Sequence, residues 1–147
     1  MVTLATVEPR LTAVVAATTT WSEYPAVWPR LLDEVYGVVR PRPELSPGDG
    51  WHNVMLYKND APSVEVGVLA SAPFDPVGRV IPSRLPGGRV ATTTHVADYA
   101  GLAGAHDSVH RFAAEQRLEL TGERWEIYGH GHEDPLSIEI YWLVRDR

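Results

Sequence analysis

The stretches SVEVGVLA (residues 63–70) and SIEIYWLV (137–144) decide the fold, because both are typical of β-strands rich in β-branched and aromatic residues. Each carries one glutamate at its third position, Glu65 or Glu139. Side chains alternate across a strand, so both glutamates are predicted on the face opposite the apolar residues. We expect helices to cover the apolar face, and we interpret Glu65 as solvent-exposed.

The agreement between the two stretches extends beyond the glutamates. A gap-free alignment of the chain with itself lays residues 10–70 on residues 84–144, matches Trp51 with Trp125, and matches one ATTT block with another. Matches in a single register over this length indicate an internal duplication. We therefore predict one domain over residues 1–147, built from two copies of one unit.

Each copy contains the same order of predicted elements. A valine- and threonine-rich strand comes first, at 11–21 or 88–96. A helix with helical apolar spacing follows, from Pro29 onward in the first copy and over 99–116 in the second. Two strands complete each copy, and the proline-rich segment 73–88 joins the copies. The pattern predicts an α+β fold, in which duplicated β-α-β-β units form an antiparallel sheet with two helices on one face.

Composition excludes several classes of function. The chain has 147 residues, a net charge of −6 and no cysteine, so disulfides and cysteine-bound metals are excluded and general attraction to nucleic acid is not expected. The N-terminus lacks a basic region before its apolar residues, and no apolar run approaches the length of a membrane span. We expect a soluble cytoplasmic protein that binds no membrane.

Aromatic residues accompany Glu139. Tyr141 and Leu143 share its predicted face, and the chain contains five tryptophans. Rings around one carboxylate suit flat, apolar and often cationic ligands, through burial and cation–π contact. We interpret Glu139 as the polar end of such a pocket.

Other polar clusters are interpreted structurally. His106 and His110 have the i, i+4 spacing of some zinc ligands, but no glutamate follows the first histidine, so we expect packing or surface roles. The segment GHGHEDP (129–135) predicts a turn rather than a metal site, and LPGGR (85–89) predicts a turn before a strand. We predict no metal and no cofactor.

Three segments carry a resemblance to a known family. GRVATTTHVADYAGLAGAHDSVHRF (88–112), GERWEIYGHGHEDPLSIEIYWLV (122–144) and WHNVMLYKNDAPSVEVGVLASAPF (51–74) resemble the GyrI-like small-molecule-binding family. That family is related to the effector-binding domains of multidrug-sensing transcription regulators. The resemblance implies a duplicated β-α-β-β fold with a ligand cleft between the copies, in agreement with the repeat.

The resemblance also implies a ligand site. Glu139 matches the family's strand glutamate by its E-x-Y-W context, and aromatic residues match the family's motifs or hold corresponding places in the first copy. The implied ligand-binding residues are Trp21, Trp51, Tyr57, Tyr99, Trp125, Tyr128 and Glu139. We expect the partner to be a small lipophilic, aromatic or cationic molecule, and a homodimer stays open.

Two other functions are open. Some proteins similar to this family hydrolyse cyclopropane-containing genotoxins, and Glu139 with Tyr141 could supply that chemistry, because a carboxylate removed from water can act as acid or base near neutral pH. The family's namesake inhibits gyrase, but the negative charge here is scattered, which makes inhibition of a protein partner the weaker alternative. In the regulators a DNA-binding module precedes the domain. The β-rich stretch here begins near residue 11, so we expect no direct nucleic-acid binding.

Overall fold

The computed structural model describes residues 1–97, 100–129 and 136–146. One antiparallel sheet contains eight strands in the order β1-β6-β8-β7-β3-β4-β2-β5. The strands are β1 (Thr3–Val7), β2 (Arg10–Thr18), β3 (Asn53–Tyr57), β4 (Ser63–Leu69), β5 (Ile81–Leu85), β6 (Gly88–Ala97), β7 (Leu118–Tyr128) and β8 (Leu136–Asp146). The helices are α1 (Tyr24–Val39), the short 3₁₀ helix η1 (Pro43–Leu45) and α2 (Leu102–Glu115).

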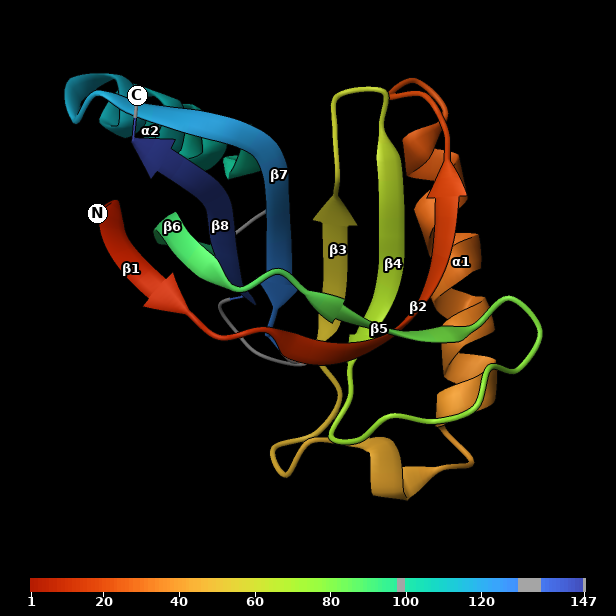
Figure 1. The fold of residues 1–147 in the computed structure, drawn as a ribbon. Coiled ribbons are helices and arrows are strands. Elements are labelled where there is room, and N and C mark those ends of the chain that lie inside the picture. Colours follow the sequence, from red (N-terminus) through yellow and green to blue (C-terminus); the bar gives the residue numbers. More distant parts are fainter. Residues whose placement is uncertain (98–99, 130–135, 147) are drawn as a thin grey trace.

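Two β-α-β-β units make up this sheet. The first is β2-α1-β3-β4 and the second is β6-α2-β7-β8, and the copies join where β3 pairs with β7 (Figure 1). Helix α1 packs on β2 and β4, whereas α2 packs on β6, β7 and β8. The predicted α+β fold with duplicated units is confirmed. Within the described residues, neither α1 nor α2 has the length and apolarity needed to cross a membrane.

The copies do not keep one gap-free register. If β4 is laid on β8 with the glutamates matched, Leu69 corresponds to Leu143. Leu69 pairs with Thr12 in the first copy, whereas Leu143 pairs with Val90 in the second. In the structure Thr12 is therefore the equivalent of Val90, whereas the gap-free alignment lays Thr12 on Pro86. The ATTT blocks are consequently not structural equivalents.

The correspondence between β3 and β7 differs again. Gly67 pairs with Val54, and Tyr141, which corresponds to Gly67, pairs with Trp125. Trp125 is thus the equivalent of Val54, and its predicted match to Trp51 is wrong. The connections between elements differ in length between the copies, and loops tolerate such differences at small free-energy cost.

The predicted alternation of side chains in the last strand of each copy is confirmed. In β8 the residues that alternate with Glu139 are buried on the helix side of the sheet: Ile138, Ile140, Trp142 and Val144. In β4 the corresponding buried residues are Val64, Val66 and Val68. This helix-side core also contains Val35 of α1 and Val109 of α2, both fully buried.

The sheet face opposite the helices carries a second apolar cluster. Val54 and Leu56 of β3 meet Leu85 of β5 and Val90 of β6, and Val7 of β1 packs against them. Residues from both ends of the strand order thus pack over the central strands, so the sheet curls. Figure 1 shows β5 and the start of β2 crossing in front of β3 and β4.

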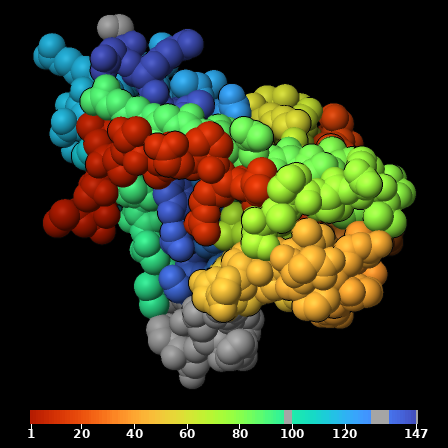
Figure 2. Space-filling view, turned by 60° about the horizontal axis from the view of Figure 1, so that its bottom comes forward, coloured from red at the N-terminus to blue at the C-terminus, as the bar shows by residue number. Residues whose placement is uncertain are grey.

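Residues 3–7 and 81–85, for which no strand is predicted from the sequence, form the two edge strands β1 and β5. Pro82 lies in β5, at an edge where a missing N–H is tolerated. The segments before β2 and after β5 also touch, since a Cβ added at Gly87 would lie 2.5 Å from Cδ of Pro9. Figure 2 shows the N-terminal segment (red) lying along the green segment that contains β6.

Two local predictions are corrected by the structure. Helix α1 begins at Tyr24, so Pro29 lies inside the helix rather than in its first turn. The hydrogen bond lost at Pro29 would go to Pro25, in the exposed first turn, and the longer helix buries Tyr24. Glu65 is 6% exposed rather than solvated, because Ser83 of β5 donates to its Oε1 (2.7 Å) and Nζ of Lys58 lies 2.7 Å from its Oε2.

Candidate functional site

A cleft of about 510 Å³ lies on the helix side of the sheet, where the two copies meet. Its walls come from α2, from β7 and β8, and from the first copy around β3 and the loop before α1. The lining residues are Trp21, Tyr57, Asp60, Leu102, Ala103, His106, Asp107, His110, Arg124, Glu126 and Trp142. A smaller hollow of about 220 Å³ adjoins it towards α1 and shares Tyr57, Leu102 and Glu126.

Alternation along β7 positions the polar floor of this cleft. Arg124, Glu126 and Tyr128 are two residues apart, so their side chains share the helix side of the sheet. Trp125 and Ile127 between them belong to the apolar cluster on the opposite face. Strand β7 therefore supplies one glutamate to the cleft from the centre of the sheet.

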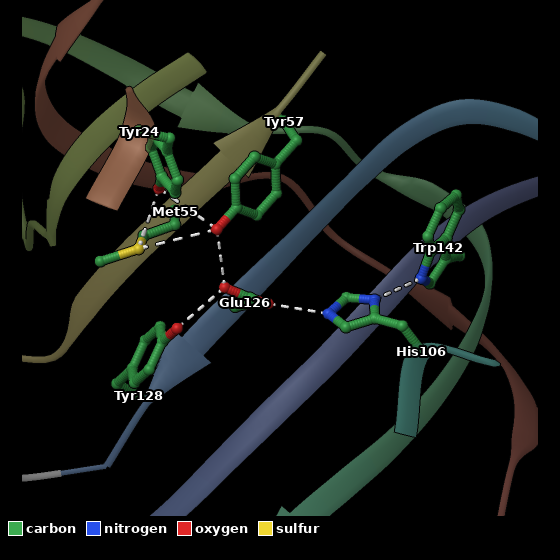
Figure 3. Close-up of polar contacts among 7 residues, drawn as sticks. All are labelled: Tyr24, Met55, Tyr57, His106, Glu126, Tyr128 and Trp142. Carbon is green, nitrogen blue, oxygen red and sulfur yellow. Dashed lines mark hydrogen bonds and ion pairs between the residues drawn. The ribbon is translucent and has the colours of Figure 1, made fainter. Parts of the chain in front are cut away.

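Glu126 accepts three hydrogen bonds (Figure 3). Its Oε1 accepts from the hydroxyls of Tyr57 (3.0 Å) and Tyr128 (2.9 Å), and its Oε2 accepts from Nε2 of His106 (2.8 Å). Only 3% of Glu126 is exposed. The carboxylate is therefore fixed in orientation by donors from both copies.

His106 approaches Glu126 as a neutral imidazole. The indole N–H of Trp142 donates to Nδ1 of His106 (2.9 Å), and an indole nitrogen can only donate. Nδ1 must therefore be unprotonated, so the proton lies on Nε2, which faces Glu126. All three donors to Glu126 are thus uncharged.

The tyrosines beside Glu126 keep their protons. Burial, followed by the negative charge of Glu126, raises the pKa of Tyr57 well above its usual value. Burial likewise raises the pKa of Tyr24, whose single hydroxyl proton can be donated either to Sδ of Met55 (3.1 Å) or to the Tyr57 hydroxyl (3.2 Å). At neutral pH these phenols act as hydrogen-bond donors.

Arg124 lies on the same wall but does not neutralise Glu126 through a hydrogen bond. Its Nη1 donates to Oδ1 of Asp60 (2.8 Å) and to the backbone oxygen of Gly122 (2.9 Å). Gly122 has a φ of 104° and lies in the irregular segment of β7 between Leu120 and Arg124. The hydrogen bond to its backbone oxygen therefore ties the Arg124 side chain to this irregular segment.

The structure divides the predicted site residues between the two faces of the sheet. Trp21 and Tyr57 line the cleft, and Tyr128 lines the adjoining hollow. Trp51 packs against the helix-side core, and Tyr99 lies outside the described residues.

Three predicted residues lie on the opposite face. Trp125 and Tyr141 stack with ring centroids 5.5 Å apart, and they line a separate pocket of about 230 Å³. The Tyr141 hydroxyl donates to Oε1 of Glu139, and burial followed by this bond raises the pKa of Tyr141 above its usual value. Glu139 and Tyr57 therefore lie on opposite faces of the sheet and cannot belong to one binding pocket.

Glu126, Arg124 and His106 line the cleft, although none of them is among the site residues predicted from the sequence. Two signals were present: Glu126 stands inside the R-W-E-x-Y-G motif, and it shares a strand face with Tyr128. His110, for which packing or a surface position is predicted, is exposed on α2 with its ring 4.5 Å from the ring of Trp142, and it also lines the cleft. In the segment 129–135, residues 130–135 lie outside the described residues.

The fold is similar to that of several solved structures. The C-terminal domain of EcmrR matches with a TM-score of 0.78 and 17% identity, over 100% of this chain and 98% of that one. The protein SAV2435, solved with bound tetraphenylphosphonium, matches with a TM-score of 0.69 and 13% identity, over 99% and 94%. A hydrolase from Listeria innocua matches with a TM-score of 0.60 and 12% identity, over 98% and 91%.

No protein-family model matches the sequence, and no curated protein matches it. At the identities above, the similarity to the solved structures concerns the fold. The chain has the GyrI-like fold that its sequence predicts.

Proposed function

We propose that the cleft between the copies binds a small lipophilic cation, with Glu126 as its counter-charge. One observation carries the proposal: Glu126 is buried, and its three hydrogen-bond donors are all neutral. A buried carboxylate is stabilised by a cationic partner, and its hydrogen bonds supply none. A ligand cation in the cleft would supply that charge.

The surrounding side chains favour an aromatic or lipophilic ligand. Trp21, Tyr57 and Trp142 line the cleft and offer apolar ring surface against which a flat or lipophilic ligand can pack. The protein SAV2435, which shares this fold, was solved with tetraphenylphosphonium, a lipophilic cation. Both points support binding of the same chemical class here.

The test compares two ions of similar shape and opposite charge. We expect tetraphenylphosphonium to bind in titration calorimetry and tetraphenylborate to bind far more weakly. Glu126→Gln should weaken tetraphenylphosphonium about 10- to 100-fold, the scale of a lost charged interaction in a buried site. Glutamine suits this test, because its oxygen can accept from His106 while its amide donates to a tyrosine oxygen.

Glu139→Gln is the matched control. Glu139 lies on the opposite face of the sheet, so its replacement should leave the affinity unchanged if the cleft is the site. If Glu139→Gln weakens binding and Glu126→Gln does not, the ligand occupies the pocket beside Trp125 and Tyr141, as the sequence-based assignment predicts. Equal affinity for the two ions would refute a cation site.

Hydrolysis is the second candidate function, because each face of the sheet pairs a carboxylate with a protonated phenol. These pairs are Glu126 with Tyr57 and Glu139 with Tyr141. A phenol can donate to a substrate carbonyl while a carboxylate activates water. The test incubates the protein with a molar excess of a cyclopropane-bearing alkylator and measures ring-opened product. Product well above one equivalent of protein would establish turnover, and its loss in one of the two Glu→Gln variants would identify the pair responsible. Product no greater than in a protein-free control would contradict it.

A further inference from the structure

Arg124 is a buried cation on the cleft wall with unused donors. The residue is 7% exposed, and Nη1 makes both of its hydrogen bonds, to Asp60 and to Gly122. Among the described residues, Nε and Nη2 have no hydrogen-bond partner. A guanidinium presents donors in a rigid fork that matches a carboxylate or a carbonyl oxygen.

Aromatic rings hold this guanidinium in place. Its central carbon lies 4.9 Å from the ring centroid of Trp142, 5.6 Å from that of Trp21 and 5.7 Å from that of Tyr57. All three rings also line the cleft. The arginine therefore has a fixed position beside the space that a ligand would fill, and little side-chain entropy remains to be lost on binding.

The two charges of the cleft floor are separate. Arg124 and Glu126 lie two residues apart on one face of β7, which places their Cα atoms ~7 Å apart. Arg124 bonds to Asp60 and Gly122, whereas Glu126 bonds to Tyr57, Tyr128 and His106. Asp60 offers only partial compensation, because its side chain is 89% exposed.

We infer that Arg124 forms a second polar subsite, which binds an anionic oxygen of the ligand. The cleft then selects amphoteric aromatic molecules, with a basic nitrogen near Glu126 and an acceptor oxygen at Arg124. This inference rests on the proposed function for its cationic end. It adds a requirement that a purely cationic ligand does not meet.

The experiment uses two dyes that differ only at one group. Rhodamine 123 is a cationic methyl ester, and rhodamine 110 is the corresponding free carboxylate. By fluorescence anisotropy, the wild type should bind rhodamine 110 about 10-fold more tightly, the scale of a hydrogen-bonded charge pair. Arg124→Gln should abolish this preference, and Arg124→Lys should keep part of it because the charge remains.

Two further variants keep the test decisive. Asp60→Asn removes the carboxylate that competes for Arg124 on an exposed turn, so the preference for rhodamine 110 should increase even if Arg124→Gln does not fold. Arg30→Gln, at an exposed position of α1, should leave the preference unchanged.

The possible results separate the two proposals. Equal affinities for the dyes in the wild type, or an unchanged ratio in Arg124→Gln, would overturn the Arg124 subsite. If both dyes then still bind more weakly to Glu126→Gln, the cation site stands alone. Failure of both dyes to bind would overturn the Arg124 subsite, and the titration with tetraphenylphosphonium would then decide the cation site separately.

Discussion

Tyr57 and Tyr128 donate to the same oxygen of Glu126, which predicts a specific energetic coupling between them. Tyr128→Phe removes one hydrogen bond to a buried carboxylate, and we expect a loss of about 1.5–3 kcal/mol in the free energy of unfolding. Tyr57→Phe should cost a similar amount, because Tyr24 loses one acceptor but keeps Met55. In each single variant the other tyrosine still satisfies Oε1.

The double variant removes both donors and leaves Oε1 buried without a hydrogen bond. Its cost should therefore exceed the sum of the single losses by about 1–2 kcal/mol. Urea unfolding of the four proteins measures this coupling, provided that the dependence on denaturant is the same for all. In a Glu126→Gln background the excess should shrink, because the charged acceptor is absent. An additive or smaller loss would refute the reasoning, since it would mean that water from the cleft replaces the missing donors.

Two further predictions concern stability. Gly67→Ala should destabilise the protein by at least about 2 kcal/mol, because a Cβ at this position would lie 1.9 Å from the backbone oxygen of Ala13. Gly37 in α1 has open space around it, so Gly37→Ala should instead stabilise the protein by about 0.5–1 kcal/mol. Thermal unfolding of both variants tests this pair, and equal effects would contradict it. Stability should also fall above about pH 10, because burial raises the pKa of Tyr24, Tyr57 and Tyr141 in the folded state, so these phenols ionise there only in the unfolded chain. The free energy of unfolding should fall by about 1.4 kcal/mol per pH unit for each of these tyrosines, and less steeply in Tyr24→Phe. Urea unfolding across pH 8–11 measures this dependence, and the same slope in Tyr24→Phe as in the wild type would contradict the role of Tyr24.

Much of the fold follows from sequence periodicity. The alternation in residues 63–70 and 137–144 correctly assigns the helix side of both strands, and the duplicated unit gives the order of elements. The edge strands at 3–7 and 81–85 escape prediction, because both are short and prolines lie in or beside them. Their position depends on the curling of the sheet, which brings distant ends of the strand order together.

The candidate site is only partly predictable, and strand parity explains the division. Trp125 and Tyr128 stand three residues apart on one strand, so they must point to opposite faces. Strand alternation alone therefore separates Trp125 from Tyr128 within the predicted pocket. It also places Glu126 with Tyr128. What no pattern reveals is which face of the sheet opens into the larger cleft, because that depends on how α2 packs.

The correspondence between β3 and β7 has a consequence for orientation. With β3 laid on β7 as their pairing partners require, Tyr57 of the first copy is the equivalent of Tyr128 of the second, and Met55 is the equivalent of Glu126. The backbone around the junction therefore has approximate two-fold symmetry, and the two tyrosines preserve it. The thioether and the carboxylate do not, because one is neutral and the other charged. A singly charged ligand bound in the reverse orientation would place its charge beside the sulfur of Met55 instead of the carboxylate of Glu126. One side chain therefore determines the orientation of a ligand in a nearly symmetric groove.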